Sequence, residues 1–128
     1  MQTVIIDIDI AIDYLRGDQY ANELMLSLWD VNTAHLSILS VYELSAGMRE
    51  DETEDTKNFI DACNIEYVDM KISKKAGEIY RRYRKEGVTL TSIDCLVNAT
   101  AVVRGHKIAT RNKDHYPDKK MLLSLKYK

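Results

Sequence analysis

The chain has 128 residues, of which 45 % are hydrophobic and 30 % charged, proportions that are typical of one globular domain. No apolar run approaches the roughly 20 residues of a membrane-spanning helix, and the N-terminus lacks the basic segment of a secretory signal. Cys63 and Cys95 do not have the spacing of a metal-binding motif, so we interpret them as free thiols of a cytoplasmic protein.

The net charge of −2 hides an uneven distribution along the chain. Residues 1–70 contain 3 basic and 15 acidic side chains, whereas residues 71–128 contain 15 basic and 5 acidic ones. The two parts therefore carry formal charges of −12 and +10, which together give the total. A cationic surface in the second part could meet phosphate groups, although two sets of solvated helix faces would give the same asymmetry.

Short β-rich segments alternate with longer helical segments in the first third of the chain. An apolar, β-branched run predicts a strand at Met1–Ile6. A helix is expected at Ile10–Arg16, ended by Gly17. A second helix is predicted at Tyr20–Trp29, before a strand at Ala34–Leu39.

The middle of the chain is predicted to be mainly helical. A helix at Ser40–Met48 opens with a Ser-x-x-Glu pattern, which predicts a capping box between Ser40 and Glu43. After a polar bend at Arg49–Asp51, another helix is expected around Thr53–Cys63.

The last part of the chain repeats the alternation of strand and helix. A short strand is predicted at Ile65–Met70 and an amphipathic helix at Ser73–Glu86. The most apolar helix is expected at Thr91–Arg104, opened by a Thr-x-x-Asp cap, and a strand at Lys107–Thr110 follows it. Strands separated by helices predict an α/β fold with a parallel sheet and helices on both faces.

Acidic residues stand near the starts of predicted helices, after the ends of strands or loops. Asp7 and Asp9 follow the first strand, and Glu43 and Asp94 lie in the first turns of later helices. Helix capping alone would explain each of them. Because the carboxyl ends of parallel strands meet at one edge of a sheet, we expect these acids to converge. Converging carboxylates need a counter-charge, and Mg²⁺ or Mn²⁺ suits oxygen ligands and can assist phosphodiester hydrolysis.

A polar segment follows the last predicted strand. Asn112 or Asp114 could complete a metal shell there, directly or through water, and Arg111 or Lys113 could hold a phosphate group. A solvated turn is the alternative interpretation of the same residues.

Four segments resemble, in order and spacing, the successive motifs of PIN domains and in particular of VapC-type toxins. The resemblance runs from about Val4 to Pro117. It rests on VIIDIDIAIDYLRG, SVYELSAG, TSIDCLVNATAVVRG and ATRNKDHYP. It implies a single PIN domain over residues 1–128, with a three-layer fold and a parallel sheet of about four or five strands.

The same resemblance implies a function and a site. Family members are endoribonucleases that bind Mg²⁺ or Mn²⁺ through three acids, which correspond to Asp7, Glu43 and Asp94. Asn112 matches the position of a frequent fourth acid; it cannot supply a negative charge, and Asp114 is the alternative. The family also implies an RNA substrate, a cognate VapB-like antitoxin that blocks the acidic pocket, and a homodimer.

Three further hypotheses stay open at this point. Asp7-Ile8-Asp9 after an apolar strand also resembles the acid pair of haloacid-dehalogenase-type phosphatases, in which Asp9 would be essential. A PIN-like module that binds RNA or protein without turnover is the second hypothesis, because the fourth acid is missing. The third is that helices within residues 10–63 form a groove for an antitoxin. Its candidate residues are Leu15, Tyr20, Leu24 and Trp29, for which core packing is the alternative role.

Overall fold

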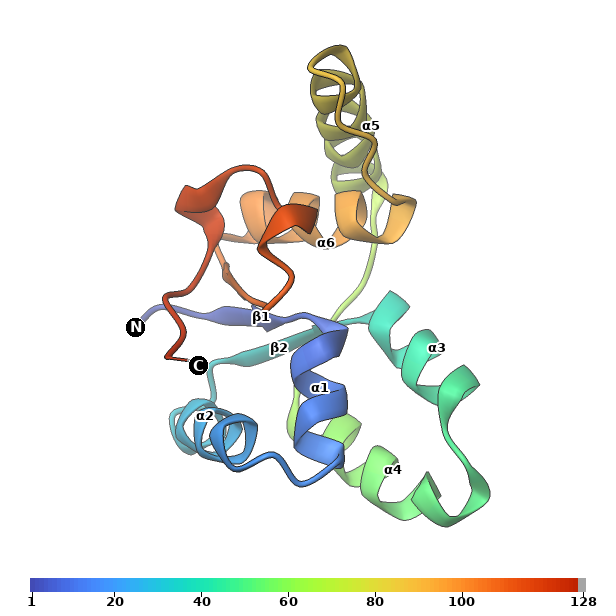
Figure 1. Cartoon of the computed structure of the whole chain (residues 1–128), viewed down its shortest axis with the longest axis vertical. Helices are drawn as coiled ribbons and strands as arrows, with labels where there is room; N and C mark the ends of the chain where they lie inside the picture. Colours follow the sequence, from blue (N-terminus) through green and yellow to red (C-terminus); the bar gives the residue numbers. More distant parts are fainter. Residues whose placement is uncertain (127–128) are drawn as a thin grey trace.

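The computed structural model of the chain describes residues 1–126, so the last two residues of the predicted domain lie outside the described part. Its centre is a parallel sheet with strand order β3-β2-β1-β4 (Figure 1). The middle position of β1 explains why its side chains are all buried. The strands are β1 (Val4–Ile6), β2 (Ala34–Ser37), β3 (Asn64–Glu66) and β4 (Lys107–Ala109).

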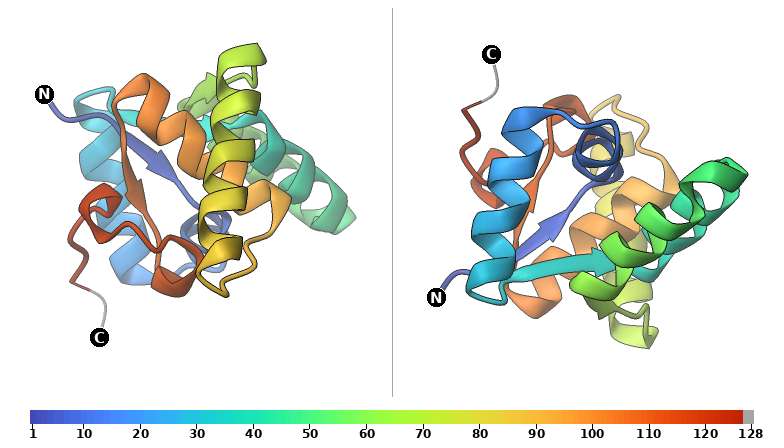
Figure 2. Two further views of the ribbon diagram at one scale, coloured as in Figure 1. Left: turned by 90° about the horizontal axis from the view of Figure 1, so that it is seen from above. Right: turned by 90° about the horizontal axis from the view of Figure 1, so that it is seen from below.

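Helices cover both faces of the sheet and give the predicted three layers (Figures 1 and 2). Alternation along β1 divides the core, because Val4 and Ile6 pack with α1 to α4 whereas Ile5 packs with α6. The helix α5 packs on the outer side of α6. The helices are α1 (Ile8–Leu15), α2 (Gln19–Asp30), α3 (Ile38–Gly47), α4 (Thr53–Ala62), α5 (Met70–Lys85) and α6 (Ser92–Arg104).

Three short 3₁₀ turns, which the sequence pattern did not predict, complete the described chain. They are η1 (Glu50–Glu52), η2 (Lys113–His115) and η3 (Lys119–Met121). Within the described residues no helix is both long enough and apolar enough to cross a membrane. Cys63 and Cys95 are buried free thiols, as predicted.

The predicted start of the first helix is wrong by two residues. The helix α1 begins at Ile8 and not at Ile10, because Asp7 is its N-cap and accepts a hydrogen bond from the Ile8 backbone N–H at 2.9 Å. Asp7 therefore stands directly between a buried strand and the first turn of a helix. Gly17 follows the helix with a φ of 85°, which is a conformation that glycine adopts without strain.

The predicted capping box between Ser40 and Glu43 is also wrong. The helix α3 begins at Ile38, and its N-cap is Ser37, whose hydroxyl accepts a hydrogen bond from the Leu39 N–H at 3.1 Å. The strand β2 consequently ends at Ser37. Glu43 lies within the second turn of the helix and has no capping task.

The strand predicted at Ile65–Met70 is displaced and shorter. The strand β3 ends at Glu66, because Asp69 caps α5 by accepting a hydrogen bond from the Ile72 N–H at 2.8 Å. The helix α5 therefore begins at Met70, three residues before the predicted start. The predicted cap on α6 is confirmed, since the Thr91 hydroxyl accepts from the Asp94 N–H at 3.1 Å.

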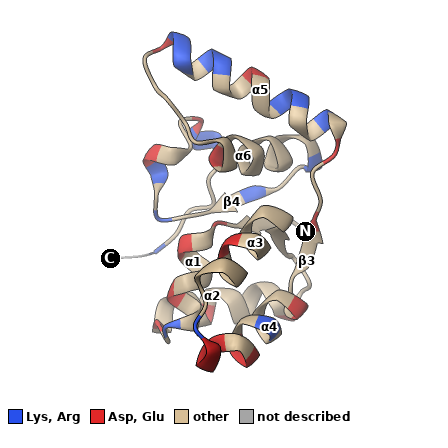
Figure 3. Cartoon of the chain, turned by 90° about the vertical axis from the view of Figure 1, so that its right-hand side faces the viewer, with Lys and Arg blue, Asp and Glu red and all other residues tan. Residues whose placement is uncertain are grey.

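The acidic and basic parts of the sequence lie on different layers of the structure. Acidic side chains are frequent on the layer of α1 to α4, and Lys and Arg side chains follow α5 on the opposite layer (Figure 3). The two layers therefore present opposite charges to possible partners.

Candidate active site

Asp7 lies at the carboxyl end of the central strand and is almost fully buried, with 5 % of its surface exposed. One carboxylate oxygen accepts from the Ile8 N–H, and the other accepts from the Thr110 hydroxyl at 2.8 Å. Burial raises the pKa of Asp7 above its ordinary value of 3.8, and these hydrogen bonds oppose that rise. The charge of Asp94 raises the pKa of Asp7 further.

Glu43 reaches the same region from α3. Its Oε1 atom is buried and has no hydrogen-bond partner among the described residues. Burial raises the pKa of Glu43 above 4.5, and the charges of Asp7 and Asp94 raise it further. Glu43 is thus a carboxylate held near two others with an unused oxygen.

Asp94 comes to the site from the first turn of α6, where it is 9 % exposed. Its Oδ2 atom lies 3.3 Å from Nδ1 of His115, whose side chain is about half exposed. Asp7, Glu43 and Asp94 therefore come from three elements and lie near enough to influence one another electrostatically. The structure brings together the three acids that the sequence predicted.

Tyr116 lies near Asp7 and Asp94, and its part in the site was not predicted from the sequence. Its side chain is fully buried. Burial raises its pKa, and the negative charges of Asp7 and Asp94 raise it further, so the phenol stays neutral. The position after a polar turn gave no signal for this role.

Asp9 and Arg111 tie α1 to the segment after β4. One oxygen of Asp9 accepts from the Ile10 N–H at 2.8 Å, and the other accepts from the Arg111 N–H at 2.7 Å. Burial raises the pKa of Asp9. The guanidinium of Arg111 lies against both carboxylate oxygens of Asp13, at 2.8 and 3.0 Å. In this structure Arg111 thus binds a carboxylate of its own chain at the position where we expected a phosphate contact.

The other predicted accessory residues lie on the outside of the site. Asn112 and Asp114 are exposed at η2. The backbone N–H of Asn112 donates to the Thr110 hydroxyl at 2.9 Å, and that hydroxyl donates in turn to Asp7. Thr110 is therefore the link between the polar segment and the buried acid, a role that the sequence analysis missed.

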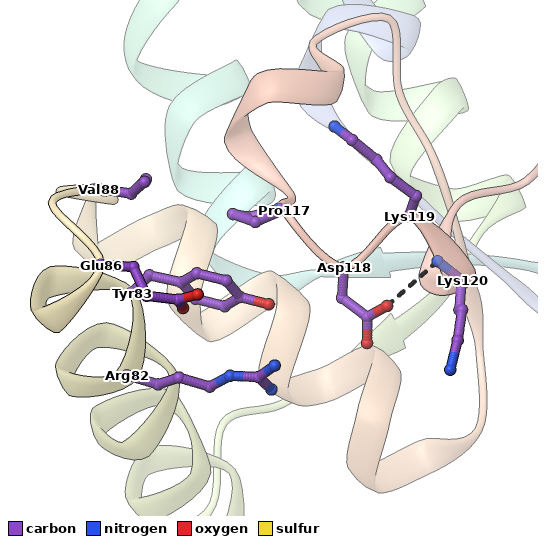
Figure 4. A pocket seen from close by; sticks show the side chains of 8 residues that line it. All are labelled: Arg82, Tyr83, Glu86, Val88, Pro117, Asp118, Lys119 and Lys120. Atoms are coloured by element: carbon purple, nitrogen blue, oxygen red, sulfur yellow. Dashed lines mark hydrogen bonds between the residues drawn. The ribbon is translucent and has the colours of Figure 1, made fainter.

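The structure has a cleft at Glu43 and a second cleft that none of the three acids lines. One, of about 360 Å³, lies among α1, α3 and α4; Glu43 lines it together with the apolar side chains of Ile8, Ile12 and Leu44. The other, of about 820 Å³, lies between the end of α5 and the segment after Tyr116 (Figure 4). Arg82, Lys119 and Lys120 contribute positive charge to this second cleft, and Glu86 and Asp118 contribute negative charge.

The candidate antitoxin-groove residues divide between clefts and core. Trp29 packs against Tyr14 and Phe59, with ring centroids 5.2 and 5.5 Å apart. Leu15 lines the cleft that contains Glu43, and Leu24 packs on the core. The Tyr20 hydroxyl accepts a hydrogen bond from the Lys126 N–H.

Comparison with known proteins gives a consistent result. The family model of the PIN domain matches residues 4–119. Ribonuclease VapC19 of Mycobacterium tuberculosis is 34 % identical over 116 residues, which cover 88 % of this chain and 91 % of the relative. Ribonuclease VapC10 of the same organism is 30 % identical over 114 residues, which cover 89 % of this chain and 86 % of the relative.

A solved structure agrees with these sequence matches. A chain of a toxin–antitoxin complex from Klebsiella pneumoniae superposes with a TM-score of 0.81 and 17 % identity, covering 95 % of this chain and 97 % of that one. At that identity the likeness concerns the fold, whereas the family match and the two relatives concern the sequence itself. This chain belongs to the PIN-domain family.

Proposed function

We propose that the chain is a metal-dependent endoribonuclease, which hydrolyses RNA phosphodiester bonds, and the toxin of a toxin–antitoxin pair. One observation carries the chemical part: Asp7, Glu43 and Asp94 meet at one edge of the sheet, where the pKa values of Asp7 and Glu43 are raised. The relatives Ribonuclease VapC19 and Ribonuclease VapC10 support RNA as the substrate. Membership of the PIN family sets aside the phosphatase alternative.

The donor set fits Mg²⁺ or Mn²⁺. All three side chains offer carboxylate oxygens, and Glu43 Oε1 has no partner among the described residues. In the described chain, the oxygens of Asp7, Glu43 and Asp94 do not all lie within 4.8 Å of one another. This spacing suits a hydrated Mg²⁺, which keeps several water ligands and needs only one or two direct carboxylates.

Hydrogen bonds within the chain orient the carboxylates of the site. When bound, the ion activates water and stabilises negative charge on a phosphoryl oxygen. The Thr110 hydroxyl fixes the orientation of Asp7, and the cap at Thr91 fixes the first turn that carries Asp94. His115 lies at the surface beside Asp94, where it can orient that carboxylate or contact a phosphate.

The cleft between α5 and the C-terminal segment supports a path for the RNA backbone. Arg82 lies beside Tyr83, and Lys120 lines the other side of the cleft beyond Asp118 (Figure 4). Phosphates attract such cations, whereas the Tyr83 ring is buried and has the Arg82 guanidinium over it at 5.1 Å. Pro117, which lines the cleft, lies two positions after His115 in the chain.

The cleft that contains Glu43 supports an antitoxin as partner. The apolar part of its lining suits an apolar face of a bound segment, and a basic side chain of that segment would pair with Glu43 in a cleft that also holds Arg16, Arg49 and Glu52. A homodimer stays a prediction, and light scattering of the purified chain tests it.

Cleavage of a mixed RNA pool tests the proposed function. The purified chain, free of any antitoxin, is incubated with Mg²⁺, Mn²⁺ or EDTA beside the variants Asp94→Asn and Asp30→Asn. Asp30 is an exposed acid at the end of α2, so its variant removes the same charge away from the site. Circular dichroism verifies that both variants fold.

We expect cleavage that requires the metal, that Asp94→Asn abolishes and that Asp30→Asn retains. Equal cleavage by wild type and Asp94→Asn would contradict the assignment of the site. Binding of Mn²⁺ without cleavage of any RNA would favour the alternative of a module without turnover, for which Asn112 in the place of an acid is the argument.

A further inference from the structure

Two histidines and a glutamate form a second cluster of ionisable groups, away from the three acids. His35 is in β2, Glu66 ends β3, and His106 stands directly before β4. Each offers one nitrogen or oxygen, and these atoms all lie within 4.8 Å of one another. No other trio of His, Cys, Asp or Glu in residues 1–126 meets this condition. His106 lies at the amino end of β4, whereas Thr110, the partner of Asp7, follows its carboxyl end.

Glu66 and His106 are buried, His35 is partly buried, and the cluster is only partly satisfied by hydrogen bonds. His106 Nε2 lies 3.1 Å from Glu66 Oε2, and the two residues are 5 % and 8 % exposed. His35 Nδ1 lies 3.7 Å from Glu66 Oε1, which is too long for a hydrogen bond. This nitrogen is buried and has no hydrogen-bond partner among the described residues. A buried nitrogen that faces a carboxylate without bonding to it calls for a further partner.

A neighbouring hydroxyl sets the ring orientation of His106. Thr3 Oγ1 lies 2.6 Å from His106 Nδ1. When Nδ1 carries the proton and donates it to Thr3, the lone pair of Nε2 points into the cluster. Metal-binding histidines are held in this way, with one nitrogen bonded to an oxygen and the other on the ion.

We propose that His35 Nδ1, His106 Nε2 and Glu66 bind a zinc-type divalent cation. Two imidazoles and one carboxylate, with water in the fourth position, form a set that suits Zn²⁺ and not Mg²⁺. Glu66 lies 3.1 Å from the ligand atom of His106 and 3.7 Å from that of His35, so small movements of the side chains would close them around one ion. The ion binds the lone pair of a neutral imidazole, so protonation of the histidines at low pH competes with it and affinity falls as the pH falls.

The positive charge of Arg104 lies near Glu66, and its removal provides a second way to test the site. Its guanidinium lies 3.6 Å from Glu66 Oε1 and donates to Asp69 Oδ2 at 3.2 Å. A positive charge at this distance weakens the binding of a cation. Replacing Arg104 by Gln should therefore tighten Zn²⁺ binding, whereas loss of His106 should weaken it.

Histidine NMR of the wild-type chain tests the site without any substitution. The chain has three histidines, and the third, His115, lies beside Asp94 in the acidic site. Zn²⁺ added to the metal-free protein should shift the ring signals of His35 and His106. A shift of His115 alone, or of no histidine, would overturn the proposal.

Zn²⁺ affinity of variants gives a second test. We expect His106→Gln and Glu66→Gln, each confirmed as folded, to bind Zn²⁺ at least about 10-fold more weakly than wild type. Asp94→Asn should keep the wild-type affinity at this site. Zn²⁺ binding that Asp94→Asn abolishes and His106→Gln leaves unchanged would place the ion at the acids and contradict the proposal.

Discussion

The two ends of β4 hold clusters of ionisable groups with opposite character. At the carboxyl end, Asp7 and its two acidic neighbours repel one another, and their surroundings raise the pKa of Asp7. At the amino end, Glu66 lies between two imidazoles, and burial together with the charge of His106 lowers the pKa of His35. The first cluster borders a cleft and the second lies within the protein. One sheet thus offers a carboxylate site for a hard cation and an imidazole site for a softer one.

Asp7→Asn should have the largest effect of the substitutions that separate the two clusters. Asparagine keeps the cap on α1 but removes a charge from the acids. Because loss of even an indirect metal contact lowers activity 10- to 100-fold, we expect RNA cleavage to fall at least about 100-fold. Unchanged cleavage in a folded variant would remove Asp7 from the site, and Zn²⁺ titration serves as the control for the second cluster.

Thr110→Val should lower cleavage by about 10-fold. The valine fills the same space but leaves Asp7 Oδ2 and the Asn112 N–H without their shared hydroxyl. The hydrogen bond from Thr110 lowers the pKa of Asp7, so its loss should move the acidic limb of the pH–rate profile to higher pH. Thr110→Ser should restore both quantities; a uniform fall in rate with an unmoved profile would indicate a structural role only.

Stability in EDTA should depend on pH in opposite directions at the two clusters. Glu43 has a raised pKa, so ionising it destabilises the fold as the pH rises above about 4.5, its ordinary value. His35 has a lowered pKa, so its contribution is full above 6.5 and is lost as the pH falls through the lowered value.

Melting temperatures of wild type and two variants, measured from acid to neutral pH, test these opposite pH dependences. Relative to wild type, Glu43→Gln should gain stability toward neutral pH, whereas His35→Gln should gain toward acid pH. If the melting temperatures of both variants followed that of wild type at a constant offset across the pH range, neither group would have a shifted pKa.

Lys120→Gln and Arg82→Gln should have the smallest effect, on RNA binding and its salt dependence. Each removes one cation from the cleft beside the site. We expect the slope of log KM against log salt concentration to fall by about 0.7 for each charge. Lys57→Gln is the control, because Lys57 is exposed on α4 and pairs with Asp61. An equal change in the control would indicate general electrostatics and not a path for RNA.

The fold could be predicted because apolar strands and amphipathic helices alternate clearly. The exact starts of three helices could not be predicted in this way, because their N-caps lie outside the apolar pattern. These caps are Asp7, Ser37 and Asp69. A polar residue before a helix also fits a loop, and Ser40 offered a competing cap that the chain does not use.

The convergence of the acids was predicted from the place of Asp7 after a strand and of Glu43 and Asp94 near the starts of helices, whereas the supporting residues were not predicted. Thr110 and Asp7 are 103 positions apart and meet only because β4 pairs with β1. His35, Glu66 and His106 likewise come from three separate strand regions and form no local motif. Strand order, which periodicity does not reveal, decides both contacts.

Mn²⁺ titration followed by electron paramagnetic resonance tests the central claim most directly. Wild type, Asp94→Asn and His106→Gln are compared as metal-free, folded proteins. The three-acid site predicts that Asp94→Asn loses Mn²⁺ binding and that His106→Gln retains it. Equal Mn²⁺ affinity in wild type and Asp94→Asn would contradict the assignment of Asp7, Glu43 and Asp94 as the metal site.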